Sequence, residues 1–131
     1  AVIKIQSDPK YLSVIRTVTV KIGELYGLSE YATKDVKLAV DEACSNVIKH
    51  TYGGDPHQRI VVKYRMTKKG FEVLIEDNGV KVQPESIEGS NVDDVRPGGL
   101  GVHLLKRAFD IFQFDQRKRK GNRLRLIRFR K

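Results

Sequence analysis

Apolar residues recur at intervals of three and four in two long stretches of the first half of the chain. The first stretch follows Ser7-Asp8-Pro9, a helix-start signal, and stops at Gly27. Ser29 is a suitable N-cap for the second stretch, which continues to about Thr51 before Gly53-Gly54. The pattern therefore predicts two successive helices, over about 9–26 and 30–51, each burying one apolar face.

Other segments have the alternation, or the β-branched and aromatic content, of strands. They are residues 2–6, 60–64, 71–75, 111–116 and 123–130. Lys68-Lys69-Gly70 separates two of them and predicts a hairpin turn. In the last segment Leu124 and Leu126 alternate with arginines, but the phase slips at Ile127, which predicts a β-bulge.

The order of the predicted elements defines a fold class. Residues 77–99 lack periodicity and are rich in Gly, Pro, Ser, Asn and Asp, and a third helix begins near Gly99 to Gly101. A strand, two helices, a hairpin, a long loop, a helix and a second hairpin predict an α+β fold. We expect a two-layer sandwich with three helices on one face of a mixed, mostly antiparallel sheet, and a single domain over residues 1–131.

Composition and charge narrow the possibilities. The sequence has no apolar run long enough to span a membrane and no signal-peptide stretch at its start, so we expect a cytoplasmic location. Residues 117–131 hold nine Lys or Arg and no acid, so this segment accounts for the whole net charge of +9. Its arginines are either the solvated face of a strand or a docking surface for an acidic protein or nucleic acid. Only Phe129 could stack on a base there, which disfavours sequence-specific nucleic-acid binding.

Three chemically distinctive groups occur in the second predicted helix. Glu42, Asn46 and His50 are four residues apart and would form one polar row, so a ligand along the helix would meet acid, amide and imidazole. Cys44 lies between them as the single cysteine, and we interpret it as a packing residue. His57 and His103 have no partner at a zinc-ligand spacing.

Two further segments complete the candidate chemistry. Asp77 ends a predicted strand, where its carboxylate can accept a hydrogen bond from an amine, and Gly79 allows close backbone approach. Pro97-Gly98-Gly99-Leu100-Gly101-Val102 leads into a helix N-terminus, which favours a phosphate group.

Together these motifs resemble the GHKL nucleotide-binding domain shared by gyrase, heat-shock chaperones, histidine kinases and mismatch-repair proteins, and more narrowly the bacterial anti-sigma factor serine kinases. The first motif is matched by Glu42, Ala43, Asn46, Ile48, His50 and Tyr52. The second is matched by Asp77 and Gly79, and the third by Gly99, Leu100 and Gly101.

The resemblance implies a Bergerat-type domain that binds ATP and Mg²⁺. Asn46 would hold Mg²⁺, Asp77 would bind the adenine amino group together with Gly79, and Gly98 to Val102 would wrap the phosphates. Glu42 would be the catalytic base, and residues 80–98 would form an ATP lid. His50 either lies beside the nucleotide or interacts with the helix C-terminus. Arg16 matches a position that contacts protein partners.

The implied function is an anti-sigma factor that phosphorylates a seryl hydroxyl of an antagonist (anti-anti-sigma) protein and sequesters a sigma factor, with homodimers possible in this family. One alternative is an ATP-binding interaction switch without catalysis, because Lys81 stands where the family often has a second glycine. A basic nucleic-acid-binding protein ranks below both. Asn122 stands where a threonine often follows the last glycine.

Overall fold

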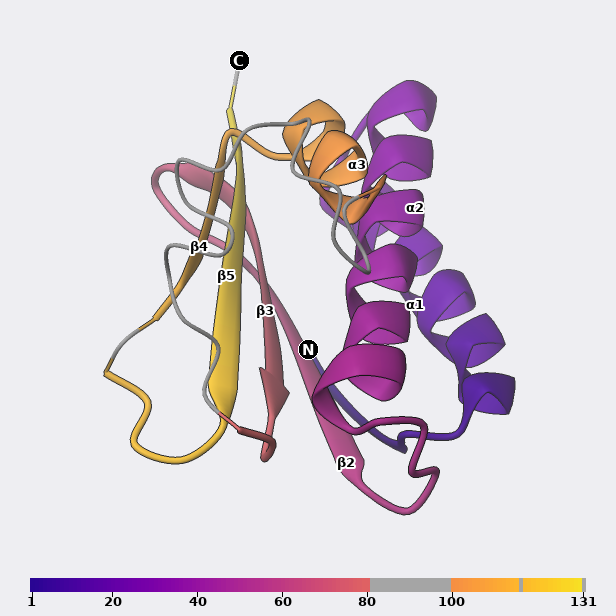
Figure 1. Ribbon diagram of the computed structural model, residues 1–131. Helices are drawn as coiled ribbons and strands as arrows, with labels where there is room; N and C mark the ends of the chain where they lie inside the picture. Colours follow the sequence, from indigo (N-terminus) through magenta and orange to yellow (C-terminus); the bar gives the residue numbers. More distant parts are fainter. Residues whose placement is uncertain (81–99, 116, 131) are drawn as a thin grey trace.

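The computed structural model describes residues 1–80, 100–115 and 117–130. Its helices are α1 (Leu12–Leu25), α2 (Glu30–Asn46) and α3 (Leu100–Ala108), with a 3-10 turn (Pro9–Tyr11) before α1 and a π-helical turn (Val47–Thr51) after α2. Its strands are β1 (Val2–Gln6), β2 (Arg59–Met66), β3 (Gly70–Asp77), β4 (Ile111–Phe114) and β5 (Asn122–Phe129). Figure 1 shows the helices on one side of the sheet, so the predicted two-layer α+β fold is confirmed.

The sheet has the strand order β1-β2-β3-β5-β4, and each neighbouring pair that the structure describes is antiparallel. β3 is the central strand, and it pairs with β2 through the predicted hairpin and with β5 at the end of the chain. The order places Asp77, the last residue of β3, opposite Asn122, the first residue of β5. Two segments far apart in sequence therefore meet at one end of the sheet.

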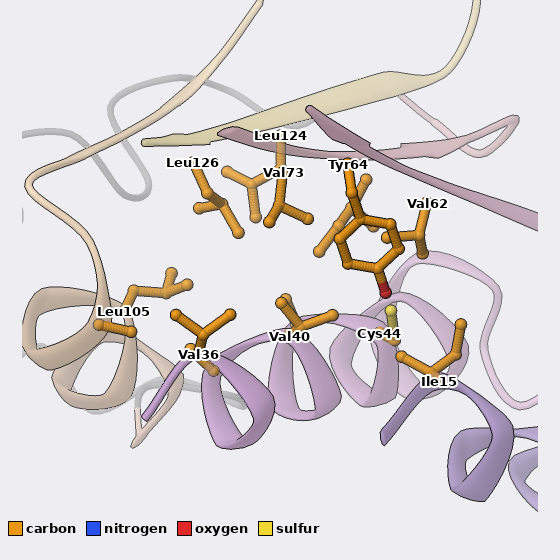
Figure 2. Close-up of a cluster of buried hydrophobic side chains, with 14 of the residues drawn as sticks. Ile15, Val36, Val40, Cys44, Val62, Tyr64, Val73, Leu105, Leu124 and Leu126 are labelled. Atoms are coloured by element: carbon orange, nitrogen blue, oxygen red, sulfur yellow. The ribbon is translucent and has the colours of Figure 1, made fainter. Parts of the chain in front are cut away.

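The core lies between the two layers. Ile15 of α1 and Val40 and Cys44 of α2 point toward Val62 and Leu126 of the sheet (Figure 2). All five side chains are fully buried, because alternate residues of each strand face the helices and the helical apolar stripes face back. The packing interpretation of Cys44 agrees with this position.

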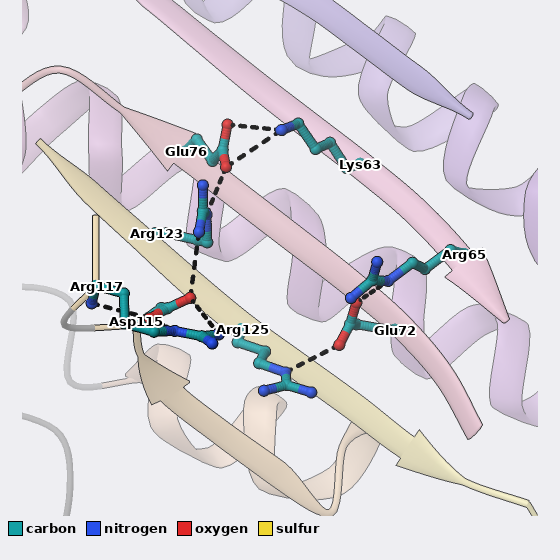
Figure 3. Close-up of polar contacts among 8 residues, drawn as sticks. All are labelled: Lys63, Arg65, Glu72, Glu76, Asp115, Arg117, Arg123 and Arg125. Atoms are coloured by element: carbon teal, nitrogen blue, oxygen red, sulfur yellow. Dashed lines mark hydrogen bonds and ion pairs between the residues drawn. The ribbon is translucent and has the colours of Figure 1, made fainter. Parts of the chain in front are cut away.

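An ion-pair ladder lies on the opposite face of the sheet (Figure 3). The Glu76 carboxylate lies between Lys63 and Arg123, with N···O distances of 3.3 Å and 2.6 Å. The Glu72 carboxylate, fully buried, lies between Arg65 and Arg125. Two arginines of the basic segment, Arg123 and Arg125, are thus paired with acids of β3, which neither interpretation of this segment anticipated.

The bulge predicted in the last strand is wrong. Pairing of β3 with β5 is uninterrupted from Gly70–Phe129 to Asp77–Asn122. Leu126 is buried against the helices, and the next residue, Ile127, is buried on the opposite face. The hydrophobic pattern slips because the strand is buried on both faces at this point, and not because an extra residue is inserted.

In the described ranges, no helix has the length and apolar character needed to cross a membrane.

Candidate functional site

The Asp77 carboxylate is the most constrained polar group at the end of β3. It is 4% exposed, and its Oδ1 accepts hydrogen bonds from the Asn122 side chain and the Gly79 backbone N–H, each at 2.9 Å. Burial raises the pKa of Asp77, although the hydrogen bonds from Asn122 and Gly79 and the charge of Lys118 act in the opposite direction. The structure thus holds a nearly buried acceptor in one orientation at a strand end.

Two glycines make this arrangement possible. A Cβ on Gly79 would lie 2.2 Å from Thr51 Cγ2. The absence of a side chain at this position therefore lets the loop after β3 approach the end of the π-helical turn. Gly121 has a φ of +69°, and its Cβ would lie 1.9 Å from the Asp77 carbonyl oxygen. Gly79 was expected from the sequence as a site residue, whereas Gly121 was not.

Tyr52, which follows the π-helical turn after α2, is hydrogen-bonded to the loop after β3. Its hydroxyl accepts a hydrogen bond from the Asn78 backbone N–H at 2.8 Å and donates one to the Arg59 carbonyl at 2.6 Å. Burial raises the pKa of Tyr52, with a further contribution from Asp77, so the hydroxyl keeps its proton at neutral pH and can donate. The first and second sequence motifs are therefore physically joined.

Two members of the expected polar row, Glu42 and Asn46, lie on α2, and the third, His50, lies in the turn that follows. Glu42 and Asn46 are one turn apart on α2 and half-buried, and among the described residues neither side chain has a hydrogen-bond partner. His50 lies in the π-helical turn and is exposed. The hydrogen-bonding pattern of the helix changes between Asn46 and His50, and His50 is the one exposed member of the predicted row.

The third motif is described in part. Leu100 and Gly101 begin α3, and the Val102 side chain is buried. α3 packs against α2, the helix that carries Asn46 (Figure 1). Gly98, Gly99 and the lid expected over residues 80–98, apart from Val80, lie outside the described residues.

Arg16, the expected partner-contact residue, pairs with Asp41. The Arg16 Nη1 to Asp41 Oδ1 distance is 3.0 Å, and 42% of the Arg16 side chain is exposed. The pair joins α1 to α2 beside Glu42, and Asp41 was not anticipated from the sequence. The guanidinium therefore has both an internal partner and an exposed surface.

The donor set fits a magnesium ion bound through a nucleotide better than a metal held by the protein alone. Among the described residues, no group of three or more His, Cys, Asp or Glu side chains could hold a metal ion. Mg²⁺ characteristically binds through one or two protein oxygens, substrate phosphates and water. The carboxamide oxygen of Asn46, half-buried and without an internal partner in the described part of the chain, meets that requirement.

Comparison with known proteins places this chain in a family. Residues 5–128 match the model of the histidine kinase-like ATPase domain. The chain is 30% identical over 116 residues to the serine-protein kinase RsbW of Listeria innocua, covering 82% of this chain and 74% of that protein. It is 25% identical over 115 residues to RsbW of Bacillus subtilis, covering 82% and 72%.

A solved structure has the same fold. The ATP binding domain of PrrB from Mycobacterium tuberculosis superposes with a TM-score of 0.57 at 16% identity, over 99% of this chain and 98% of that one. The chain therefore belongs to the histidine kinase-like ATPase domain family. Its resemblance to the serine kinases of that family, expected from the three motifs, is confirmed by the RsbW relatives.

Proposed function

We propose that this protein is a cytoplasmic anti-sigma factor with ATP-dependent serine kinase activity, which phosphorylates a seryl hydroxyl of an antagonist protein and sequesters a sigma factor. The observation that carries the proposal is the Asp77 carboxylate, nearly buried, held by Asn122 and Gly79, and joined through Asn78 and Tyr52 to the helix that carries Glu42 and Asn46. The serine-protein kinase relatives support the same reaction class.

Three groups of residues would bind ATP in this proposal. Asp77 accepts a hydrogen bond from the adenine amino group, since an ionised carboxylate offers acceptors alone. Gly98 to Val102 would hold the phosphates through backbone N–H groups, with residues 80–98 as a lid over them. Asn46 would hold Mg²⁺, whose charge would offset that of the phosphates.

Phosphoryl transfer then needs a base and an acceptor hydroxyl. Glu42 takes the proton of the seryl hydroxyl as that oxygen bonds to the γ-phosphorus, and the bond from phosphorus to the β-γ bridging oxygen breaks to release ADP. Glu42 suits this role because it lies one helical turn from Asn46 and is half-buried. With no hydrogen-bond partner among the described residues, its carboxylate is not committed to a structural contact.

Partner binding uses a surface that includes Arg16. The guanidinium is held by Asp41 next to Glu42 and remains partly exposed, so a protein docked over the nucleotide site would reach it. The sigma factor and the antagonist would compete for this region, and the lid would respond to the nucleotide. A homodimer would present two such surfaces.

The decisive assay combines labelled ATP with a cognate antagonist protein. Wild type should transfer phosphate to serine, and Glu42→Ala should abolish transfer while retaining the rise in melting temperature that Mg-ATP produces. Asn46→Ala should lose that rise as well. Glu24→Ala, a change at an exposed carboxylate on α1, is the matched control and should leave both unchanged.

The same assay separates the catalytic proposal from the non-catalytic switch. A Mg-ATP-dependent rise in melting temperature without transfer, with Glu42→Ala equal to wild type, would favour the switch and refute the kinase. Absence of any nucleotide binding would refute both.

A further inference from the structure

A groove of about 560 Å³ lies at the end of the molecule away from Asp77. It is bounded by the turn between α1 and α2 and by the last residues of β5. Phe129, which lines it, pairs with Gly70 at the start of β3, whereas Asp77 ends that strand. At about 3.3 Å per residue, the length of β3 separates the groove from the Asp77 site by roughly 20 Å.

The groove concentrates apolar side chains that folding has left in contact with water. Leu25 is 78% exposed, Phe129 is 44% exposed and Tyr26 is 37% exposed, and Met66 contributes to the same lining. The Tyr26 ring is held by Phe71, with ring centroids 5.6 Å apart. Exposed apolar residues gathered in one hollow, with an aromatic ring already fixed by the core, are typical of a protein-binding surface.

The charged side chains that line the groove are both positive. Arg128 and Arg130 line it, and no carboxylate does so among the described residues. Arg128 donates to the Ala108 carbonyl through Nη1, which fixes its guanidinium at the groove. The Arg130 backbone N–H donates to the Lys69 carbonyl, so the basic turn between β2 and β3 lies alongside. The nearby Asp110 carboxylate is engaged by the Phe129 backbone N–H at 2.7 Å.

We propose that this groove docks an acidic segment of a partner protein in which Asp or Glu residues flank one or two large apolar side chains. The apolar anchor fills the space between Leu25, Tyr26 and Phe129, and the carboxylates pair with Arg128 and Arg130. The volume matches a few side chains and not the face of a whole domain. These arginines differ from Arg123 and Arg125 of the same strand, which acids of β3 already occupy.

Docking here is independent of the nucleotide site. None of the lining residues belongs to the groups assigned to ATP, so the groove should bind its segment with or without Mg-ATP. A protein without kinase activity would therefore not contradict the docking proposal, and a protein that fails to dock the segment would not contradict the proposed kinase activity.

The test uses a short fluorescein-labelled peptide of interspersed Glu and Leu residues, followed by fluorescence anisotropy and by ¹⁵N NMR of the whole chain. We expect saturable binding and shifts at the backbone amides of Gly27, Ala32 and Phe129. Leu25→Ser and Arg130→Glu should each weaken binding at least about fivefold, because one removes the apolar anchor contact and the other reverses a charge.

Matched controls separate the groove from the general positive charge. Val14→Ser removes an exposed apolar side chain of α1 that lies outside the groove. Lys4→Glu makes the same charge change as Arg130→Glu, but on β1. Both variants should bind the peptide within about twofold of wild type. Peptides with Lys for Glu, or Ser for Leu, should not bind. Equal weakening by Lys4→Glu and Arg130→Glu would overturn the proposal. So would a homodimer that Leu25→Ser dissociates, since a second copy would then occupy the groove.

Discussion

The Asn122 carboxamide donates one hydrogen bond to the Asp77 carboxylate and another to the Val80 carbonyl, each at 2.9 Å. One side chain of β5 thereby orients the candidate adenine-binding carboxylate and the residue that opens the expected lid. The family position often holds a threonine, whose hydroxyl has a single hydrogen to donate. Asn122 can donate to both groups at once.

Replacing Asn122 by alanine should weaken ATP binding about tenfold, because a hydrogen bond to a charged group contributes about 1.5–3 kcal/mol. Isothermal titration calorimetry with Mg-ATP measures the change. Asn122→Thr, which keeps one donor, should lie between alanine and wild type. An Asn122→Ala protein that binds ATP with unchanged affinity would show that Asp77 needs no such support.

Gly79→Ala should destabilise the fold by about 1–3 kcal/mol, since the added methyl group would lie 2.2 Å from Thr51 Cγ2. Chemical denaturation measures this loss. Thr51→Ser removes the opposing methyl group, so the double variant should recover much of the stability. If Gly79→Ala proves equally unstable in both backgrounds, the contact with Thr51 is not the cause.

Glu72→Ala should cost about 2 kcal/mol of unfolding free energy, because it leaves Arg65 and Arg125 without their shared, fully buried partner. Glu24 forms an exposed pair with Lys21 on α1, and Glu24→Ala should change stability by less than about 0.5 kcal/mol. Urea unfolding of both variants tests the contrast. Similar losses at the two positions would contradict the role of burial.

Stability should fall in acid as the ladder loses its charges. Burial alone would raise the pKa of Glu76, but hydrogen bonds from Arg123 and Lys63 outweigh it and hold the pKa below its ordinary value. Hydrogen bonds from Arg117, with one from Arg123, lower the pKa of Asp115 as well.

A carboxyl group with a lowered folded-state pKa stabilises the fold above its unfolded pKa of about 4, and that stability is lost as the pH falls through the folded value. Melting temperatures measured between neutral and acidic pH should therefore drop below about pH 4. Glu76→Gln should drop less steeply. Parallel curves for the two proteins would refute the linkage to Glu76.

Native Cys44 should resist thiol reagents. Burial, with a smaller contribution from the charge of Asp41, raises the pKa of this thiol to about 12, so almost no thiolate exists at pH 8. Absorbance with Ellman's reagent should show slow labelling of the folded protein and complete labelling in denaturant. Rapid labelling of the folded state would mean that the helix opens at Cys44.

Local signals in the sequence predicted most of the elements. Ser29 caps α2 as expected, through a hydrogen bond from the Ala32 N–H to its Oγ, and the Lys68-Lys69-Gly70 turn joins β2 to β3. These features depend on neighbours within a few residues, and the residue pattern carries that information. The motif residues Glu42, Asn46 and Asp77 were also visible, because they occur at the spacing of recognisable motifs.

The residue pattern did not predict which distant segments come into contact. The turn at Val47–Thr51 is π-helical, and no local signal distinguished it from a continued α-helix. The buried arginine partners on β3 and the burial of Ile127 depended on which strands became neighbours. An alternating pattern specifies two faces of a strand but not what covers each face.

The sequence by itself determined most of the elements and their order, because these follow from periodicity and local backbone preference, and it supplied the motif residues that carry the family resemblance. Only the tertiary structure decided that Asn122 orients Asp77 across 45 residues of chain, and that Leu25 and Phe129 share a groove with two arginines. Those relationships depend on strand order and helix packing, which balance many weak contacts over the whole core.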